Sequence, residues 1–181
     1  KKGANSKELG IDINSTSTIE TQLTRLDGNQ YLYGQGRNGQ LPLDQQQAQG
    51  TMFINFGPRL DPNLSYIGFD GVSRPYNAQR NNIEDFYATG GTWTNTVALN
   101  KSFDGGSLRL AGSTVGNNSI VPNSGLNRQS FNLTGIFTPI KRLSIDTLLN
   151  YILEQVKNRP MVSDGSGNAN YNAIFLPTSV N

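Results

Sequence analysis

Side chains that commonly perform catalysis are scarce in this sequence. It has no His and no Cys, which excludes a Cys nucleophile, a zinc–thiolate site and a His-based triad within these residues. The carboxylates are dispersed: Glu84 and Asp85 are typical of a helix start, whereas Asp12, Asp146 and Glu154 belong to different expected strands. No base clusters with a nucleophile. We therefore expect no enzyme, no catalytic residue, no metal site and no cofactor; the substrate-binding residues are unknown at this stage.

A Gly-x-Gly-x-x-Gly pattern occurs at residues 34–39. A dinucleotide site needs a buried strand before these glycines and a helix that starts within them, so that backbone amides face the pyrophosphate. Here Pro42 breaks any such helix. We interpret the segment as a glycine-rich turn.

Residues Asp164, Ser166 and Asn168 occupy the first, third and fifth positions of a calcium-binding loop. The sixth position is Ala169 instead of Gly, and the twelfth is Phe175 instead of a bidentate carboxylate. We therefore expect a solvated turn.

Neutral polar residues dominate the composition. Hydrophobic residues make up 35% and charged residues 15%, and both fractions are below those of ordinary globular domains. Disorder is not favoured, because the net charge is only +2 and aromatic residues reach 9%. The scattered Lys and Arg residues argue against a nucleic-acid partner, and no apolar run is long enough for a membrane helix.

Apolar and polar residues alternate repeatedly, which is typical of strands with one apolar face. Leu108 and Leu110, for example, flank Arg109. The alternation predicts strands near residues 7–20, 92–101, 107–115, 129–138 and 143–155.

Short and long connections alternate between these strands along the chain. Residues 104–106 (Asp-Gly-Gly) predict a tight hairpin, and residues 138–142 form another short link. Residues 116–128 are expected to be a longer polar loop, and the stretches 21–91 and 158–181 are longer still. One end of the sheet therefore carries minimal turns and the other carries the long loops.

The long stretch 21–91 contains one expected helix. Asn81 or Asn82 can cap it, Ile83 and Phe86 form an apolar stripe, and Gly90 would end it. The remainder is expected to be ordered loop, because a free linker rarely holds so many aromatic residues. Its aromatic residues, such as Tyr31, Tyr66 and Tyr76, could stack on sugars or pack against other parts of the protein. We favour packing.

Strands of about ten residues with one apolar face and unequal connections are typical of a transmembrane β-barrel. The expected fold class is all-β and antiparallel. A soluble extracellular β-sandwich, of the adhesin or carbohydrate-binding type, also has alternating strands and is the alternative. A surface hydrolase that uses Asp146 or Glu154 is a third hypothesis.

Several short segments occur in an order and at spacings that resemble the SusC/RagA type of TonB-dependent outer-membrane transporter. The resemblance extends over nearly the whole chain. Its segments are Lys1–Gly3, Tyr33–Gly36, Phe56–Asp61, Asn82–Phe86 with Thr89 and Gly90, Ile120–Ser124, Leu126–Arg128, Phe131–Leu133 and Val156–Pro160.

The resemblance implies that residues 1–6 end a plug domain and that residues 7–181 form the N-terminal part of a 22-stranded barrel, with a long extracellular loop at 21–91 that contains a short helix near 82–89. It implies a chain that is one section of a transporter in the outer membrane of a Gram-negative bacterium, in contact with lipid. The whole protein would import oligosaccharides or peptides together with a SusD-like surface lipoprotein, driven by TonB through the plug.

Overall fold

The computed structural model describes residues 8–23, 28–165 and 167–180, and these residues form two compact units. The first, which we call the sheet unit, comprises Lys1–Thr21 and Thr89–Arg159; the second, the loop unit, comprises Gln22–Ala88 and Pro160–Asn181. The chain therefore enters the loop unit twice. The plug junction expected at residues 1–6 lies outside the described residues.

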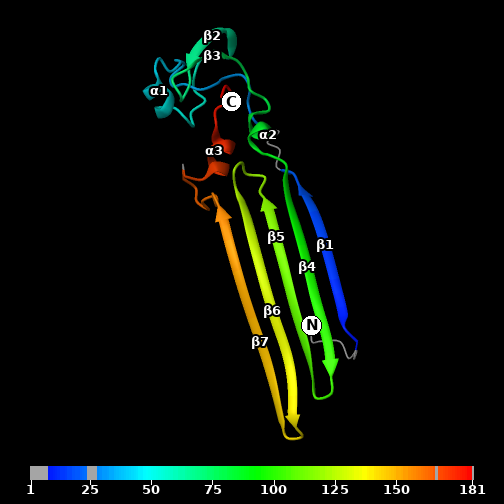
Figure 1. Cartoon of the computed structure of the whole chain (residues 1–181). Coiled ribbons are helices and arrows are strands. Elements are labelled where there is room, and N and C mark those ends of the chain that lie inside the picture. The colour runs from blue at the N-terminus through cyan, green and yellow to red at the C-terminus, as the bar shows by residue number, and fades with distance from the viewer. Residues whose placement is uncertain (1–7, 24–27, 166, 181) are drawn as a thin grey trace. The chain divides into compact units, whose positions relative to one another are not determined.

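The sheet unit is a five-stranded antiparallel sheet (Figure 1). Its spatial order is β1-β4-β5-β6-β7, which follows the chain within this unit. The prediction of an all-β, antiparallel fold is confirmed, and the four strands expected after residue 90 are all present and longer than expected. The strands are β1 (Gly10–Glu20), β4 (Gly90–Phe103), β5 (Gly106–Asn118), β6 (Gly125–Ile140) and β7 (Leu143–Lys157).

The connections within the sheet are shorter than the sequence suggested. β4 and β5 are joined by Asp104 and Gly105, and Gly105 has the positive φ of 92° that this turn requires. The expected loop at 116–128 is wrong in extent, because pairing continues as far as Asn118 and Gly125. The polar residues at these strand ends continue the hydrogen-bonded ladder although they show no apolar alternation.

The loop unit contains three short helices and one hairpin among its described residues. The hairpin pairs β2 (Asp61–Ile67) with β3 (Ser73–Tyr76). The sequence pattern revealed only one of the helices. The helices are α1 (Gln45–Gly50), α2 (Asn82–Phe86) and α3 (Ala169–Phe175).

Helix α2 is the helix expected in this stretch, but it ends earlier. Its N-cap residue Asn81 makes no side-chain capping hydrogen bond, and the extended backbone of Tyr87 ends the helix. The sequence analysis expected Gly90 to end this helix. Gly90 is instead the first residue of β4.

A small aromatic core holds the loop unit together. Tyr66, Tyr76 and Val180 are buried, and the two tyrosine rings meet edge to face at 5.6 Å between centroids. Partly buried apolar side chains pack around them: Leu41, Leu60, Phe69 and Leu176. Packing, the role favoured for the loop tyrosines, is thus confirmed for Tyr66 and Tyr76.

The segment 177–180 is buried within this unit and is hydrogen-bonded to several distant parts of the chain. The Ser179 hydroxyl accepts a hydrogen bond from the Gln35 amide at 2.9 Å, and the Ser179 carbonyl accepts one from the Tyr66 hydroxyl at 2.9 Å. Two further carbonyls accept hydrogen bonds: that of residue 178 from the backbone of Gln79, and that of residue 180 from the Asn82 side chain. The C-terminal segment of the loop unit, Pro160–Asn181, thus completes the core formed by its N-terminal segment, Gln22–Ala88.

Candidate functional site: the faces of the sheet and the hollows of the loop unit

The register of the sheet decides which side chains share a face, because directly opposite residues on antiparallel strands point to the same side. One cross-strand row is apolar on all five strands. It runs through Ile11, Leu99, Leu110, Leu133 and Leu149. We call this side of the sheet the apolar face.

The apolar face is exposed. The exposed fraction is 59% for Ile11, 47% for Leu110 and 60% for Leu149. In the described part of the sheet unit, the strands pack only against their sheet neighbours, and no second layer covers this face. A β-sandwich would bury these same residues between two sheets, so the single layer does not have that architecture.

Aromatic rings lie near both ends of the apolar face. Phe103 and Phe137 lie near the two-residue turns, and Trp93 lies ten residues back along β4. Ten residues span about 33 Å along a strand, which a strand tilt of roughly 40° reduces to about 25 Å, the height of the apolar band of a transmembrane barrel. The Trp93 ring packs on Gly116, where a Cβ atom would collide with it.

One row within this band departs from the expected apolar pattern. It is polar on four strands, and the Ser15 hydroxyl donates a hydrogen bond of 2.7 Å to the Asn95 side chain. Ser15 and Asn95 therefore satisfy some of each other's polar groups within the apolar face. The four polar residues are Ser15, Asn95, Thr114 and Gln129.

The opposite face, which we call the polar face, carries a cross-strand network. The Asn100 amide donates to Asp12 at 2.8 Å, and Arg109 donates to Asn100 at 2.7 Å and to Asp12 at 3.3 Å. The three side chains come from β1, β4 and β5, so the network links three strands. Sequence analysis assigned Asp12 no partner, because it could not align strands separated by the long loop.

On the three inner strands, the polar face is more sheltered than the apolar face. On β4, Ala98 and Asn100 are 1% and 8% exposed, whereas Val97 and Leu99 on the other side are 49% and 38% exposed. No second layer covers either face in the described part of this unit, so the difference arises from neighbouring side chains within the sheet, such as Arg109 against Asn100.

Strand β7 has apolar residues on both faces. The register assigns Leu148, Ile152 and Val156 to the polar face, where they are exposed. The sequence prediction of one apolar and one polar face is therefore wrong for this strand. The apolar doublets Leu148-Leu149 and Tyr151-Ile152 were the signal that could have revealed it.

The glycine-rich segment 34–39 forms a tight turn in the loop unit, which confirms the turn interpretation. Arg37 and Gln40 exchange backbone hydrogen bonds of 3.1 and 3.0 Å, and between them Asn38 and Gly39 have φ values of 53° and 74°. Two positive φ values in an Asn-Gly pair are typical of a type I′ hairpin turn. Gly36 packs against Gly57 and the Gln40 carbonyl, and a Cβ atom would collide there.

The buried Tyr76 hydroxyl joins this segment to the core. It accepts a hydrogen bond from the Gly34 amide at 3.0 Å and lies 3.0 Å from the Gln35 carbonyl, to which it can donate. Burial raises the pKa of Tyr76 to about 12 and also raises the pKa of Tyr66. Tyr31 instead lies under the Arg80 guanidinium, 4.6 Å from its ring centroid. These tyrosines are structural contacts.

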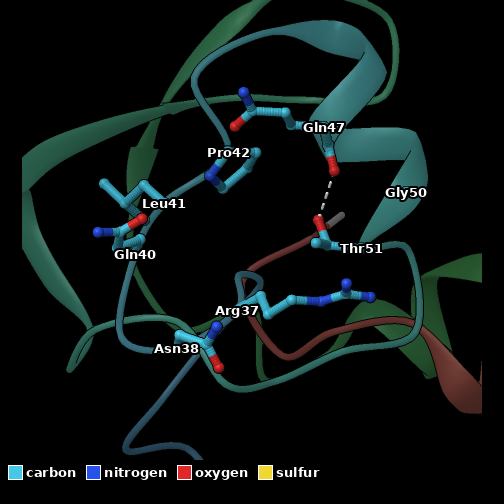
Figure 2. A pocket seen from close by; sticks show the side chains of 8 residues that line it. All are labelled: Arg37, Asn38, Gln40, Leu41, Pro42, Gln47, Gly50 and Thr51. Carbon is cyan, nitrogen blue, oxygen red and sulfur yellow. Dashed lines mark hydrogen bonds between the residues drawn. The ribbon is translucent and has the colours of Figure 1, made fainter.

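Two hollows are lined in part by residues of this turn. One, of about 300 Å³, is lined mainly by polar side chains (Figure 2). The other, of about 740 Å³, is mainly apolar and includes Leu32, Tyr33 and Phe56. Asn38 lines both hollows. Sequence analysis named no residue of either hollow as a binding residue, although the Asn38-Gly39 pair is a strong hairpin signal.

Comparisons with protein-family models and with curated proteins give no match. The function is therefore inferred from the residues and their geometry. Among the helices of the described residues, none has the length and apolar character needed to cross a membrane.

The described residues contain no group of three or more potential metal ligands. Of the calcium-loop positions, Ser166 lies outside the described residues. Asn168, which we expected in a solvated turn, is the N-cap residue of α3. Its side-chain oxygen accepts a hydrogen bond from the backbone N–H of Asn170 at 2.9 Å.

Proposed function

We propose that the sheet unit is a section of the wall of a transmembrane β-barrel, and that the chain belongs to an outer-membrane, TonB-dependent transporter of the SusC/RagA type. The observation that carries the proposal is the inverted arrangement of the sheet. On the three inner strands β4, β5 and β6, its apolar face is more exposed than its polar face, as expected for a wall with lipid outside and water inside.

Strand length supports the same proposal. The strands contain 11 to 16 residues, whereas strands of soluble proteins average five or six and a bilayer needs about nine to eleven. At one end, the connections β4–β5 and β6–β7 have only two residues each. Such turns are typical of the periplasmic side of an outer-membrane barrel.

The edges of the sheet support a larger assembly. In the sheet order, β1 and β7 each have only one neighbour among the described strands. Because unpaired backbone groups are very costly in lipid, a spanning sheet must close on itself. We therefore propose that further strands pair with β1 and β7, and the family resemblance suggests 22 strands in all.

In this proposal the polar face lines a passage and binds no cofactor. The network of Asp12, Asn100 and Arg109 would face water in the lumen. From the resemblance, the transporter would import oligosaccharides or peptides, with a SusD-like lipoprotein and TonB as partners. The process is binding and gated passage, without bond-making.

Single-cysteine labelling tests the proposal, because the chain has no Cys of its own. Leu110→Cys on the apolar face and Ala111→Cys on the polar face are adjacent on β5 and form a matched pair. Each is made in the intact transporter in outer membranes and labelled with an environment-sensitive maleimide fluorophore. We expect a nitroxide lipid to quench the label at position 110 and a water-soluble quencher to reach the label at position 111.

Extension of the scan along β5 should reproduce the alternation at Leu108 and Arg109. Equal quenching by lipid at all positions, or release of the protein into buffer without detergent, would contradict the barrel. The sandwich alternative predicts that neither quencher reaches position 110.

A further inference from the structure

The polar hollow of the loop unit holds a cation with no counter-charge. Among the residues that the structure describes, no carboxylate pairs with Arg37, and no Asp or Glu lines the hollow. The side chains of Asn38 and Gln40 also make no hydrogen bond within the described part of the chain. The hollow therefore presents a positive charge and two amide groups to solvent.

The type I′ turn holds these groups in a fixed arrangement. Arg37 and Gln40 are directly opposite each other across the turn, so their side chains lie on the same side of the hairpin. Figure 2 shows Arg37 and Asn38 on one side of the hollow and Gln47 on the other. The Oε1 atom of Gln47 accepts the Leu43 amide at 3.1 Å, which fixes this side chain and leaves its NH₂ group for a ligand.

The chemistry of this lining selects a ligand. A guanidinium binds a carboxylate through two parallel N–H···O bonds, and each side-chain amide offers donors and an acceptor that match neighbouring hydroxyl groups. The hollow of about 300 Å³ is small and lies at the lower limit for binding pockets. A single carboxylated sugar has the required charge, hydroxyl groups and size.

The second hollow extends the site. It shares Asn38 with the first and contains Tyr33 and Phe56, which are 49% and 74% exposed. Exposed rings of this kind provide flat apolar surfaces on which the C–H face of a sugar ring can pack. An oligosaccharide can therefore contact both hollows, with its acidic unit at Arg37.

We propose that the two hollows form a binding site for an acidic oligosaccharide, in which Arg37 binds the carboxylate and Asn38 contacts two successive sugar units. The inference rests on the proposed function, since it names a substrate class for the transporter. It concerns the loop unit alone, whereas the labelling experiment on β5 tests the sheet unit.

Calorimetry on the intact transporter in detergent tests this site. The probes are a tetramer of galacturonic acid, its methyl ester and a tetrapeptide of glutamic acid. We expect the acidic sugar to bind at least about tenfold more tightly than the ester, since a charge-assisted pair is lost in the ester. We expect the peptide to bind weakly, because it lacks the hydroxyl groups that the amides recognise.

Variants identify the residues responsible. Arg37→Gln should remove the tenfold preference for the acid over the ester. Arg59→Gln is the matched control, because Arg59 is an exposed arginine of the same unit that lines neither hollow. Asn38→Gly keeps the positive φ that glycine tolerates and should weaken binding of both sugars by about threefold.

Equal binding of acid and ester, no binding of either, or full retention of acid binding by Arg37→Gln would overturn the site. Tight, Arg37-dependent binding of the glutamate peptide would overturn the sugar class. None of these results alters the quenching pattern of β5, so failure of this inference is distinguishable from failure of the transporter proposal.

Discussion

The sheet unit and the loop unit bury opposite kinds of side chain. The loop unit seals Tyr66 and Tyr76 in a core, as a protein does in water. The sheet unit exposes Leu110 and Leu149 and shelters Asn100. In the proposed transporter, the contrast has a simple cause: the loop unit is patterned for water and the outer face of the sheet unit is patterned for lipid.

The largest expected effect breaks the loop unit and spares the sheet. Gly36→Ala introduces a Cβ atom that collides with the Gln40 carbonyl and the Gly57 backbone, at a φ of 147°. We expect a loss of on the order of 4 kcal/mol, from backbone strain and overpacking together. Hydrogen exchange should accelerate in β2 and β3 and stay unchanged in β4 and β5.

Gly39→Ala is the control for this change, because its Cβ atom would meet open space and only its φ of 74° is unfavourable. It should cost about 1 kcal/mol. If both variants were equally stable, the packing of Gly36 would not matter.

The second-largest effect is expected in the sheet unit. Leu110→Arg introduces a charge into the middle of the apolar face and should cost about 3 kcal/mol in a bilayer. Ser113→Arg, on the polar face of the same strand, should cost little. Urea unfolding of the transporter in liposomes measures both, and equal costs would contradict a lipid-facing apolar side.

A smaller effect comes from one hydroxyl of the loop core. Tyr76→Phe leaves the Gly34 amide and the Gln35 carbonyl buried without this partner, which should cost about 2 kcal/mol. Tyr33→Phe, at an exposed tyrosine of the same unit, should be nearly neutral. Limited proteolysis of the loop unit compares the two variants.

Alkaline pH should also separate the units. Because burial raises the pKa values of Tyr66 and Tyr76 above the ordinary value of 10.0, their contribution to stability is complete below pH 10 and is lost as pH rises toward 12. The loss should be on the order of 1 to 2 kcal/mol after screening. The described strands of the sheet unit contain no buried tyrosine, so proteolysis across this range should cut the loop unit first.

The smallest effect concerns the polar network of the sheet. Arg109→Gln removes the contact with Asp12, whose side chain is 69% exposed, and should cost under about 1 kcal/mol. Arg142→Gln in the β6–β7 turn is the control. A loss above that of Leu110→Arg would show that the sheet is held by its polar face.

Alternation predicted strands β4 to β7 because each keeps an apolar face over much of its length, and these strands are joined by short links. It did not predict the pairing of β1 with β4, since β1 ends at Glu20 and β4 begins at Gly90. Residues at strand ends, such as Asn117 and Leu126, pair without any apolar pattern.

The loop unit was largely beyond sequence prediction. Its core joins residues near position 35 to residues near position 179, and such long-range contacts leave no local period in the sequence. The burial of Tyr66 and Tyr76 was expected from the number of aromatic residues, but their partner Val180 was not. The hollows depend on the Asn38-Gly39 turn, whose hairpin signal was interpreted only as a glycine-rich turn.

The Thr178 hydroxyl donates a hydrogen bond to the Tyr33 carbonyl, and the Gln35 amide donates one to the Ser179 hydroxyl; these pairs are 145 and 144 residues apart. Ribosomes deliver a chain from its N-terminus, so the first passage through this unit waits for its last partner until all of β7 has been synthesised. Closure over such a separation is slow, and the tyrosine cluster remains open to proteases in the meantime. A chain that stops before residue 177 therefore lacks the hydrogen bonds and the buried Val180 side chain that complete this core.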